Sequence, residues 1–311
     1  MKQFFCLIIA VAVLLCGCTA GEPGREASAL FTDDLGREVS LPEEPKRVAC
    51  LLGSFADVWM NAGGTVIAAP DDAWEDFGLE MQPDATVLGS AKSLNLELLL
   101  AAEPDLILAS ANTRQQLQWQ DTLEATGIPT VYFHVSDFGD YLRLLEFCTA
   151  ITGRTDLYEQ YGTHIQAQID ETIAQSHQRI EEAGKAPTVL CLRLAASGIR
   201  VKNSRDNVLG EMLSSLGCVN IADSDTVLLE NVSMEHILLA DPDFIFLVQQ
   251  GDDTEGTQAV LDAFIADNPG WQSLTAVQEG RVFTLDKRRY SLKPNALWAE
   301  AYSDLRMLIW P

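Results

Sequence analysis

The sequence predicts an α/β protein of two similar lobes with parallel sheets, joined by one long α-helix. Three patterns lead to this prediction. Short apolar runs alternate with helical patterns along most of the chain, which is typical of parallel strands covered by helices. One helical pattern without proline then fills residues 156–183. After this stretch, the same alternation of strands and helices resumes.

The composition indicates a folded, acidic protein. The chain has 311 residues, of which 47% are hydrophobic and 21% are charged, enough for one large core or two ordinary ones. Its 45 acidic residues outnumber its 21 Lys and Arg, which gives a formal net charge of −24. Such a charge is poorly suited to binding nucleic acid, or to binding an anionic membrane surface through charge.

The first 17 residues predict a secretory signal peptide. Lys2 precedes an apolar run at 4–15 that is too short to span a bilayer. The run ends in the tetrad LCGC, which is similar to a bacterial lipobox and would make Cys18 the lipidated N-terminus. Residues 18–30 have the composition of a flexible tether. We expect an extracytoplasmic protein anchored to the membrane by lipid; an ordinary signal peptide with an incidental cysteine is the alternative.

The strand patterns divide the mature chain into two lobes. After a predicted hairpin in TDDLGREVSLP come the runs RVACLLG, TVIAAP, ATVLG, DLILAS and TVYFHV. Beyond the long helical pattern come TVLCLRL, CVNIA, DFIFLV and RVFTLD. We predict an N-terminal lobe at 31–153, a connecting helix at 154–184 and a C-terminal lobe at 185–311. At 1.5 Å per residue the helix would be about 40 Å long.

An internal repeat indicates that the two lobes are duplicates. The segment LNLELLLAAEPDLIL at 94–108 matches VSMEHILLADPDFIF at 232–246, and Glu235 lies 138 positions after Glu97. Two Rossmann-like lobes joined by a rigid helix follow from this pattern. The cleft between such lobes is the expected ligand site.

The order of these features resembles the periplasmic-binding-protein family for iron-siderophore, haem and cobalamin uptake. The lipobox, DDLGREVSLP, the PKRV strand, the two repeated blocks, the long helix and KPN before the last helix carry the resemblance, which covers essentially the whole mature chain. It implies a monomeric lipoprotein, with no cofactor of its own, that captures a ferric siderophore, haem or a corrinoid. It also implies delivery to an ABC permease dimer with a cytoplasmic ATPase, and small hinge motions only.

Two glutamates are candidates for contact with that permease. Asn95 and Ser233 are good helix N-caps, and they place Glu97 and Glu235 in the first turns of two helices. A carboxylate there gains roughly 0.3–1 kcal/mol from the helix dipole, so helix stabilisation alone is one explanation. In proteins that resemble this one, the equivalent glutamates dock into arginine pockets of two permease subunits, and the resemblance implies that role here.

Basic residues are concentrated in two windows of the second half. The first window follows the opening strand of the second lobe, and most of the second follows its last strand. The nine residues are Arg193, Arg200, Lys202, Arg205, Arg281, Lys287, Arg288, Arg289 and Lys293. Because parallel strands end at one sheet edge, we expect an anion site for carboxylate, propionate or phosphate groups. Solvated loop charge is the alternative.

From these windows and from other predicted strand exits we select the ligand contacts. Aromatic faces beside guanidinium groups suit a macrocycle or a catecholate chelate. The predicted contacts are Phe55, Trp74, Lys92, Arg114, His134, Arg193, Arg200, Arg288, Arg289 and Tyr290. Either Tyr290 or His134 also offers a ligand to the metal of a bound chelate.

Several other chemistries are disfavoured. The four histidines lack metal-ligand spacing, so a metal should arrive inside a chelator. No phosphate-binding glycine motif and no nucleophile elbow occurs. Two alternatives stay open: a scavenging or sensing lipoprotein of the same fold that works without a permease, and, more distantly, a surface-anchored hydrolase.

Four cysteines follow the lipobox, and none forms a Cys-x-x-Cys pair. We expect Cys50, Cys148, Cys191 and Cys218 to be free and buried. A bridge between Cys191 and Cys218 stays possible.

Overall fold

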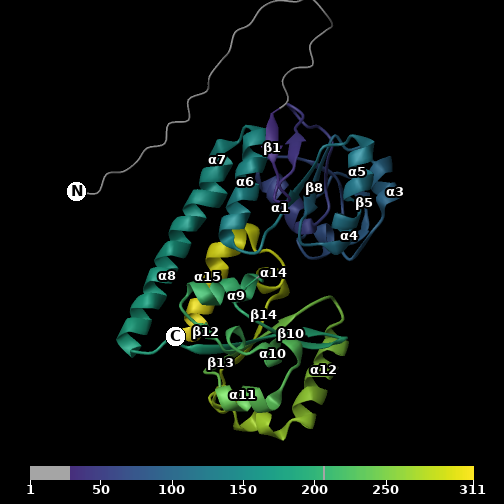
Figure 1. Ribbon diagram of the computed structural model, residues 1–311. Helices are drawn as coiled ribbons and strands as arrows, with labels where there is room; N and C mark the ends of the chain where they lie inside the picture. The colour runs from purple at the N-terminus through teal and green to yellow at the C-terminus, as the bar shows by residue number, and fades with distance from the viewer. Residues whose placement is uncertain (1–28, 206) are drawn as a thin grey trace, which may run out of the picture.

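The computed structural model describes residues 29–205 and 207–311, and it consists of two α/β lobes with a long helix beside them (Figure 1). Each lobe has its own five-stranded sheet, so the predicted fold class is confirmed. No helix in these two ranges is long and apolar enough to cross a membrane. The predicted signal peptide and Cys18 lie outside the described residues.

The sheet of the N-terminal lobe is parallel, with strand order β5-β4-β3-β8-β9. Its strands are β3 (Val48–Cys50), β4 (Val66–Ala69), β5 (Thr86–Val87), β8 (Leu106–Ser110) and β9 (Thr130–Phe133). Both faces of the sheet are buried. Leu108 and Phe133 belong to one hydrophobic cluster, whereas their chain neighbours Ile107 and Tyr132 belong to another on the opposite face. This burial explains why the strands are continuous apolar runs in the sequence.

Helices and two short antiparallel strand pairs complete this lobe. The helices are α1 (Gly53–Asn61), α2 (Asp72–Glu75), α3 (Leu96–Ala101), α4 (Arg114–Gln118), α5 (Gln120–Thr126) and α6 (Phe138–Thr152). The pairs are β1 (Leu30–Thr32) with β2 (Glu38–Ser40), and β6 (Gly89–Ser90) with β7 (Ser93–Leu94).

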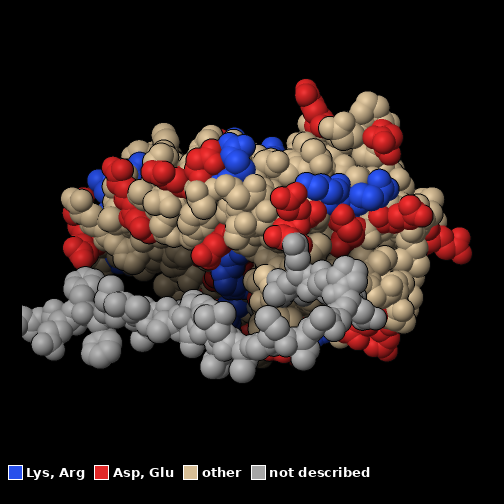
Figure 2. Space-filling view, turned by 90° about the horizontal axis from the view of Figure 1, so that it is seen from above, with Lys and Arg blue, Asp and Glu red and all other residues tan. Residues whose placement is uncertain are grey.

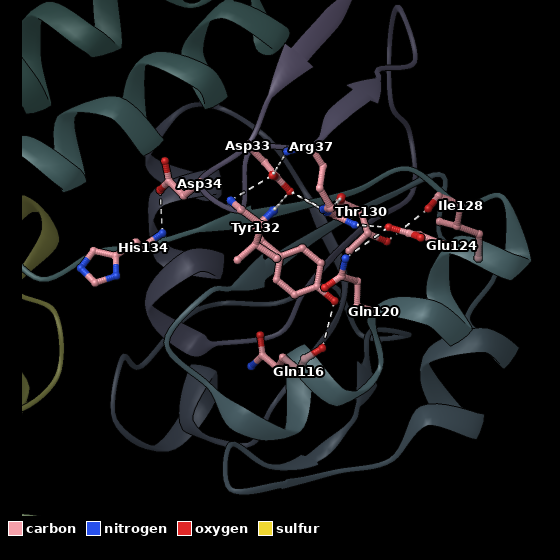
Figure 3. Close-up of polar contacts among 11 residues, drawn as sticks. Asp33, Asp34, Arg37, Gln116, Gln120, Glu124, Ile128, Thr130, Tyr132 and His134 are labelled. Carbon is pink, nitrogen blue, oxygen red and sulfur yellow. Dashed lines mark hydrogen bonds and ion pairs between the residues drawn. The ribbon is translucent and has the colours of Figure 1, made fainter.

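Polar contacts fasten the β1–β2 hairpin to the edge strand β9 (Figure 3). The buried carboxylate of Asp33 accepts hydrogen bonds from the backbone and side chain of Arg37 and from the backbone N–H of Tyr132. The Arg37 guanidinium donates to the carbonyl of Thr130 and lies 4.7 Å from the centroid of the Tyr132 ring. Because the Asp33 carboxylate, the Arg37 guanidinium and the β9 backbone satisfy one another's hydrogen bonds, they fix the hairpin in position on the lobe.

The connecting helix is continuous from Thr155 to Ala183. It begins as α7 (Thr155–Tyr158), passes through a π-helical turn at Glu159–Thr163 and continues as α8 (His164–Ala183). It ends at Gly184, whose positive φ of 69° allows the chain to turn away. The buried Ile165 and Ile169 face the core.

The sheet of the C-terminal lobe has the order β11-β10-β13-β14, and β12 also pairs with β10. Its strands are β10 (Thr188–Ala195), β11 (Gly198–Lys202), β12 (Val219–Asn220), β13 (Phe244–Gln249) and β14 (Val282–Leu285). Strand β11 is antiparallel to β10, whereas the other pairs are parallel. The first basic window was expected to follow the opening strand of this lobe; instead, Arg193 lies in β10, and Arg200 and Lys202 lie in β11. Gly198, at a φ of 137°, allows the tight turn.

The last helix returns from the C-terminal lobe to the connecting helix. The helices of this lobe are α9 (Val208–Ser215), α10 (Thr226–Glu230), α11 (Met234–Ala240), α12 (Thr254–Asp267), α13 (Thr275–Gln278), α14 (Lys287–Tyr290) and α15 (Trp298–Ile309). Figure 1 shows α15 beside α8, and the two helices are in contact. The fully buried Trp298 packs edge-on against Phe138 and at a tilt against Tyr141, both on α6. One hydrophobic cluster therefore includes residues of both lobes and joins them.

The sequence repeat has a structural counterpart. Asp105 follows α3, and its carboxylate accepts the backbone N–H groups of Lys46 and Arg47 just before β3. Asp243 follows α11, and its carboxylate accepts the backbone N–H of Thr188 at the start of β10. Equivalent aspartates thus fix the chain at the start of β3 in one lobe and of β10 in the other.

Candidate ligand cleft and docking surfaces

A pocket of about 310 Å³ lies between the lobes at the ends of strands from both sheets. The N-terminal lobe contributes the segment after β4 and residues 90–92. The C-terminal lobe contributes Arg193 of β10, residues 250–252 after β13, and residues in and after α14. Strand exits on facing lobes thus form the cleft, as expected for open α/β sheets.

The N-terminal wall of this interlobe pocket is acidic. Four carboxylates line it: Asp71, Asp72, Glu75 and Asp76. Burial raises the pKa of Asp72 to about 6, and the neighbouring Asp76 and Asp71 add to the rise. The Asp72 carboxylate also accepts the backbone N–H of Gly53, where the chain passes so close that a Cβ would lie 2.6 Å from the Ala73 nitrogen. This wall is therefore held against the start of α1.

The cleft contains charges of both signs, whereas no acidic residue was among the predicted contacts. The ammonium of Lys287 lies 2.6 Å from an Asp76 oxygen and 2.5 Å from an Asp252 oxygen, so it bridges the two lobes. Figure 2 views the molecule from above Figure 1 and shows acidic side chains across much of the visible face, with basic side chains in a few groups.

A larger basic pocket of about 740 Å³ adjoins the cleft on the C-terminal lobe. The β10–β11 hairpin and the segment at 228–232 form its walls, and Arg193 and Gln250 line both pockets. Arg193 and Arg200 lie directly opposite each other on the antiparallel strands. Burial lowers the pKa of Arg193, and the charge of Arg200 lowers it further. Within 29–205 and 207–311, no carboxylate forms an ion pair with either arginine.

Lys293 adds a third positive charge beside this pair. Burial lowers its pKa to about 8, the charge of Arg193 lowers it further, and Asp140 opposes the shift. Asp140 lies on α6, so the environment of Lys293 includes both lobes. A group of cations that repel one another in a partly buried setting favours an anionic ligand.

Three of the predicted contacts line these pockets, whereas His134 is exposed outside both of them. Lys92 and Arg193 line the interlobe pocket, and Arg200 lines the basic pocket. The side chain of His134 is 40% exposed after β9, and its ring nitrogen lies 3.1 Å from the Ser136 hydroxyl. The backbone N–H of His134 donates to Asp34, as Figure 3 shows.

The three aromatic residues that we predicted as ligand contacts line neither pocket. Phe55 is only 1% exposed and packs edge-on against Phe133 inside the N-terminal lobe. Tyr290 is 4% exposed, and its hydroxyl donates to the carbonyl of Ala301. Trp74 is half-buried on α2, packs against the core and lines neither pocket. All three rings therefore support the hydrophobic core and not the walls of the pockets.

Arg288 and Arg289 were also predicted as ligand contacts, but both pair with carboxylates of the protein and line neither pocket. The Arg289 guanidinium pairs with Asp304 and Glu300 of α15, so its charge is already compensated. Arg288 lies 3.4 Å from the Asp57 carboxylate of α1. The remaining predicted contact, Arg114, is exposed at the start of α4 and lines neither pocket.

Asn295 completes the contact between the lobes. It is 1% exposed with a positive φ of 53°, and its amide donates to the carbonyl of Ser54 and to the Asp57 carboxylate. Burial raises the pKa of Asp57, although Asn295 and Arg288 counteract the rise. A buried amide in a strained backbone conformation indicates that this junction is tightly specified.

Sequence reasoning missed the acidic wall, the lobe-bridging role of Lys287 and the electrostatic position of Lys293. The signal for the wall was present, because Asp71 and Asp72 directly follow the strand pattern TVIAAP. The predicted contacts were basic and aromatic residues and His134, so acidic residues at a strand exit were not selected.

The duplicated glutamates lie on short helices of the two lobes. The Asn95 side chain caps α3 by accepting the backbone N–H of Glu97, and Ser233 caps α11 by accepting that of His236. Both Glu97 and Glu235 are exposed. Across the described part of the chain, no group of three or more His, Cys, Asp or Glu residues is arranged to hold a metal ion.

The chain matches the family described as periplasmic binding protein over residues 48–289. It is 27% identical to the Fe(3+)-citrate-binding protein YfmC of Bacillus subtilis, an alignment that covers 90% of this chain and 89% of that protein. It is 27% identical to the vitamin B12-binding protein of Pectobacterium atrosepticum over 69% of this chain and 76% of that one.

A solved structure shows the same fold. The fold matches S. aureus IsdE complexed with heme at a TM-score of 0.71 and 14% identity, covering 86% of this chain and all of that one. The family model spans most of the two-lobed region. This chain therefore belongs to the periplasmic binding protein family.

Proposed function

We propose that this protein captures an anionic organic metal chelate in the interlobe cleft and delivers it to an ABC permease. The opposed Arg193–Arg200 pair carries the proposal. Like charges directly across a strand pair destabilise a sheet, so a protein that has them gains stability when an anion binds between them. Guanidinium groups pair well with carboxylate and phosphate oxygens.

The size and chemistry of the site suit an organic chelate. Pockets for small molecules usually measure roughly 300–1,000 Å³, and both pockets here fall in that range. The described residues offer no cluster for a bare metal ion, which favours a metal that arrives inside its chelator. The relatives named above bind ferric citrate, vitamin B12 and haem, and these are the ligand classes we consider.

The ligand class can be identified with purified protein. We would measure thermal stabilisation and visible spectra with ferric citrate, a ferric siderophore, haem and cobinamide, one at a time. We expect one of them to stabilise the protein, and Arg193→Ala or Arg200→Ala to weaken its binding at least tenfold. Arg114→Ala, which removes an exposed arginine outside both pockets, is the matched control. Failure of all four chelates to bind would refute the proposal.

Delivery to a permease rests on Glu97 and Glu235. We propose that these exposed carboxylates, one on each lobe, pair with cations of two permease subunits. The double variant Glu97→Ala/Glu235→Ala should bind its chelate normally but lose uptake in cells. Glu181→Ala, an exposed glutamate of the connecting helix, should leave uptake unchanged. Normal uptake by the double variant would favour the alternative of a scavenging or sensing protein.

The remaining expectations about location and organisation are also proposals. We propose that the mature protein is a monomer, divided at 154 and 184 by the connecting helix. We further propose that it is anchored outside the cytoplasm through lipid on Cys18. Globomycin-sensitive processing and loss of membrane association in Cys18→Ser would support the anchor, and unchanged fractionation would contradict it.

A further inference from the structure

Exposed apolar side chains gather near the two duplicated glutamates. Within 29–205 and 207–311, nine large apolar residues are exposed, and five of them lie on α3, α10 and α11. These five are Leu98, Val227, Leu229, Leu238 and Leu239. Leu239 is 88% exposed, more than any other of the nine. Burial in this lobe therefore does not account for a leucine at this position.

The helix geometry places Leu239 beside Glu235. The two residues are four positions apart on α11, so they share one face of the helix. Helix α10 is fixed against α11, because Asp225 pairs with the ring of His236 at 2.6 Å. The α11 face thus combines a carboxylate with a large apolar group on a supported helix.

The equivalent face of the N-terminal lobe differs at one decisive position. Four residues after Glu97 stands Ala101, which is also exposed. The repeat therefore keeps the glutamate on both helices, but only α11 has a large apolar side chain four residues after it. The two surfaces are chemically distinct, although the lobes share a fold.

We propose that Leu239 and Glu235 together form the permease-docking surface of the C-terminal lobe. The leucine fits an apolar depression of the permease, beside the permease cation that pairs with the Glu235 carboxylate. This inference rests on the proposed function. Charge complementarity identifies the occupant as a protein with a basic group, and an apolar contact beside that pair excludes water from it. Because Ala101 provides no such contact, the permease distinguishes the two lobes.

The test measures uptake by cells in which the full chain is replaced by each variant. The probes are ⁵⁵Fe-labelled ferric citrate, ⁵⁵Fe-labelled haem and ⁵⁷Co-labelled cobinamide, supplied separately. Leu239→Ala should lower the uptake rate about tenfold, as expected for loss of a buried apolar contact. Leu239→Met keeps the apolar volume and should retain uptake. Met307→Ala, at a 57% exposed site on α15, is the matched control and should also retain it.

The outcomes separate this inference from the proposed function. In the purified Leu239→Ala variant, thermal stabilisation by the same probes should match the unmodified chain. Normal uptake by Leu239→Ala, together with loss of uptake in Glu97→Ala/Glu235→Ala, would overturn only the inference. Uptake of no probe by unmodified cells, or normal uptake by the double glutamate variant, would overturn both. Binding of purified protein to phosphatidylglycerol vesicles that is lost in Leu239→Ala would make the leucine a membrane contact and refute the inference.

Discussion

Replacing Lys293 with methionine should stabilise the empty protein and weaken its binding of an anionic chelate. Burial and the charge of Arg193 lower the pKa of Lys293 from 10.5 to about 8. One pKa unit corresponds to about 1.4 kcal/mol, so the shift sets an upper limit of about 3 kcal/mol on the cost of the charge at pH 7. Water screens part of this cost because the side chain is partly exposed. We therefore expect Lys293→Met to gain about 1–2 kcal/mol in free energy of unfolding.

The pH dependence identifies the cause of this gain. Between pH 8 and 10.5 the lysine is protonated in the unfolded chain but largely neutral in the folded one. Since the unfolded state then binds more protons, the contribution of Lys293 to stability rises with pH through this window. The difference between Lys293→Met and the unmodified protein should be greatest below pH 8 and should shrink by about 1–2 kcal/mol as the pH approaches 10.5.

Urea denaturation at pH 7, 8, 9 and 10 measures this difference directly. Comparing two proteins at each pH cancels the titration of other groups, such as the buried cysteines and tyrosines. Lys92→Met, at an exposed lysine of the interlobe pocket, should change stability by less than about 0.5 kcal/mol. Equal stability of Lys293→Met and the unmodified protein at pH 7, or a difference that stays constant to pH 10, would refute the electrostatic reasoning.

Three further predictions concern the cleft wall and the core. Gly53→Ala should lower the free energy of unfolding by about 1–3 kcal/mol, because its Cβ would lie 2.6 Å from the Ala73 nitrogen; an unchanged Tm would contradict this. Asp72→Asn should stabilise the protein by about 1–2 kcal/mol at pH 7, because the raised pKa of about 6 shows that the charged carboxylate is unfavourable in the folded state. The contribution of Asp72 to the free energy of unfolding should fall as the pH rises from about 4 to 6. Urea titrations of the two proteins that show no such pH dependence would contradict this prediction. The described cysteines are free and buried: Cys50, Cys148, Cys191 and Cys218. A thiol reagent should therefore label them only during unfolding. Rapid labelling of the native protein would contradict their burial.

Features with a local period could be predicted from the sequence. The connecting helix has apolar residues at helical spacing, no proline and a terminal glycine, and the structure places it at nearly the predicted residues. The two sheets appear in the sequence as apolar runs because their strands are buried on both faces. The sequence repeat aligns Asp105 with Asp243, and in the structure each carboxylate accepts a backbone N–H at or just before the first strand of its sheet.

Side-chain direction at the strand exits could not be predicted in the same way. A helix rotates by about 100° per residue, so neighbours in one turn point to different surroundings. On α2, Asp72 and Glu75 line the pocket while Trp74 packs on the core. Phe55 and Tyr290 also follow strands, yet both rings are buried.

The sequence by itself determined the two α/β lobes, the connecting helix, the duplicated glutamates and the concentration of basic residues in the second half. These features depend on residue type and spacing along the chain. Only the tertiary structure decided which charges meet across the cleft. It placed Arg200 opposite Arg193 through an antiparallel hairpin and brought Asp76 of the acidic wall to Lys287. It also paired Arg289 of α14 with a carboxylate of α15. Electrostatic and packing energies depend on distances between residues far apart in the chain, and these distances exist only once the lobes have folded together.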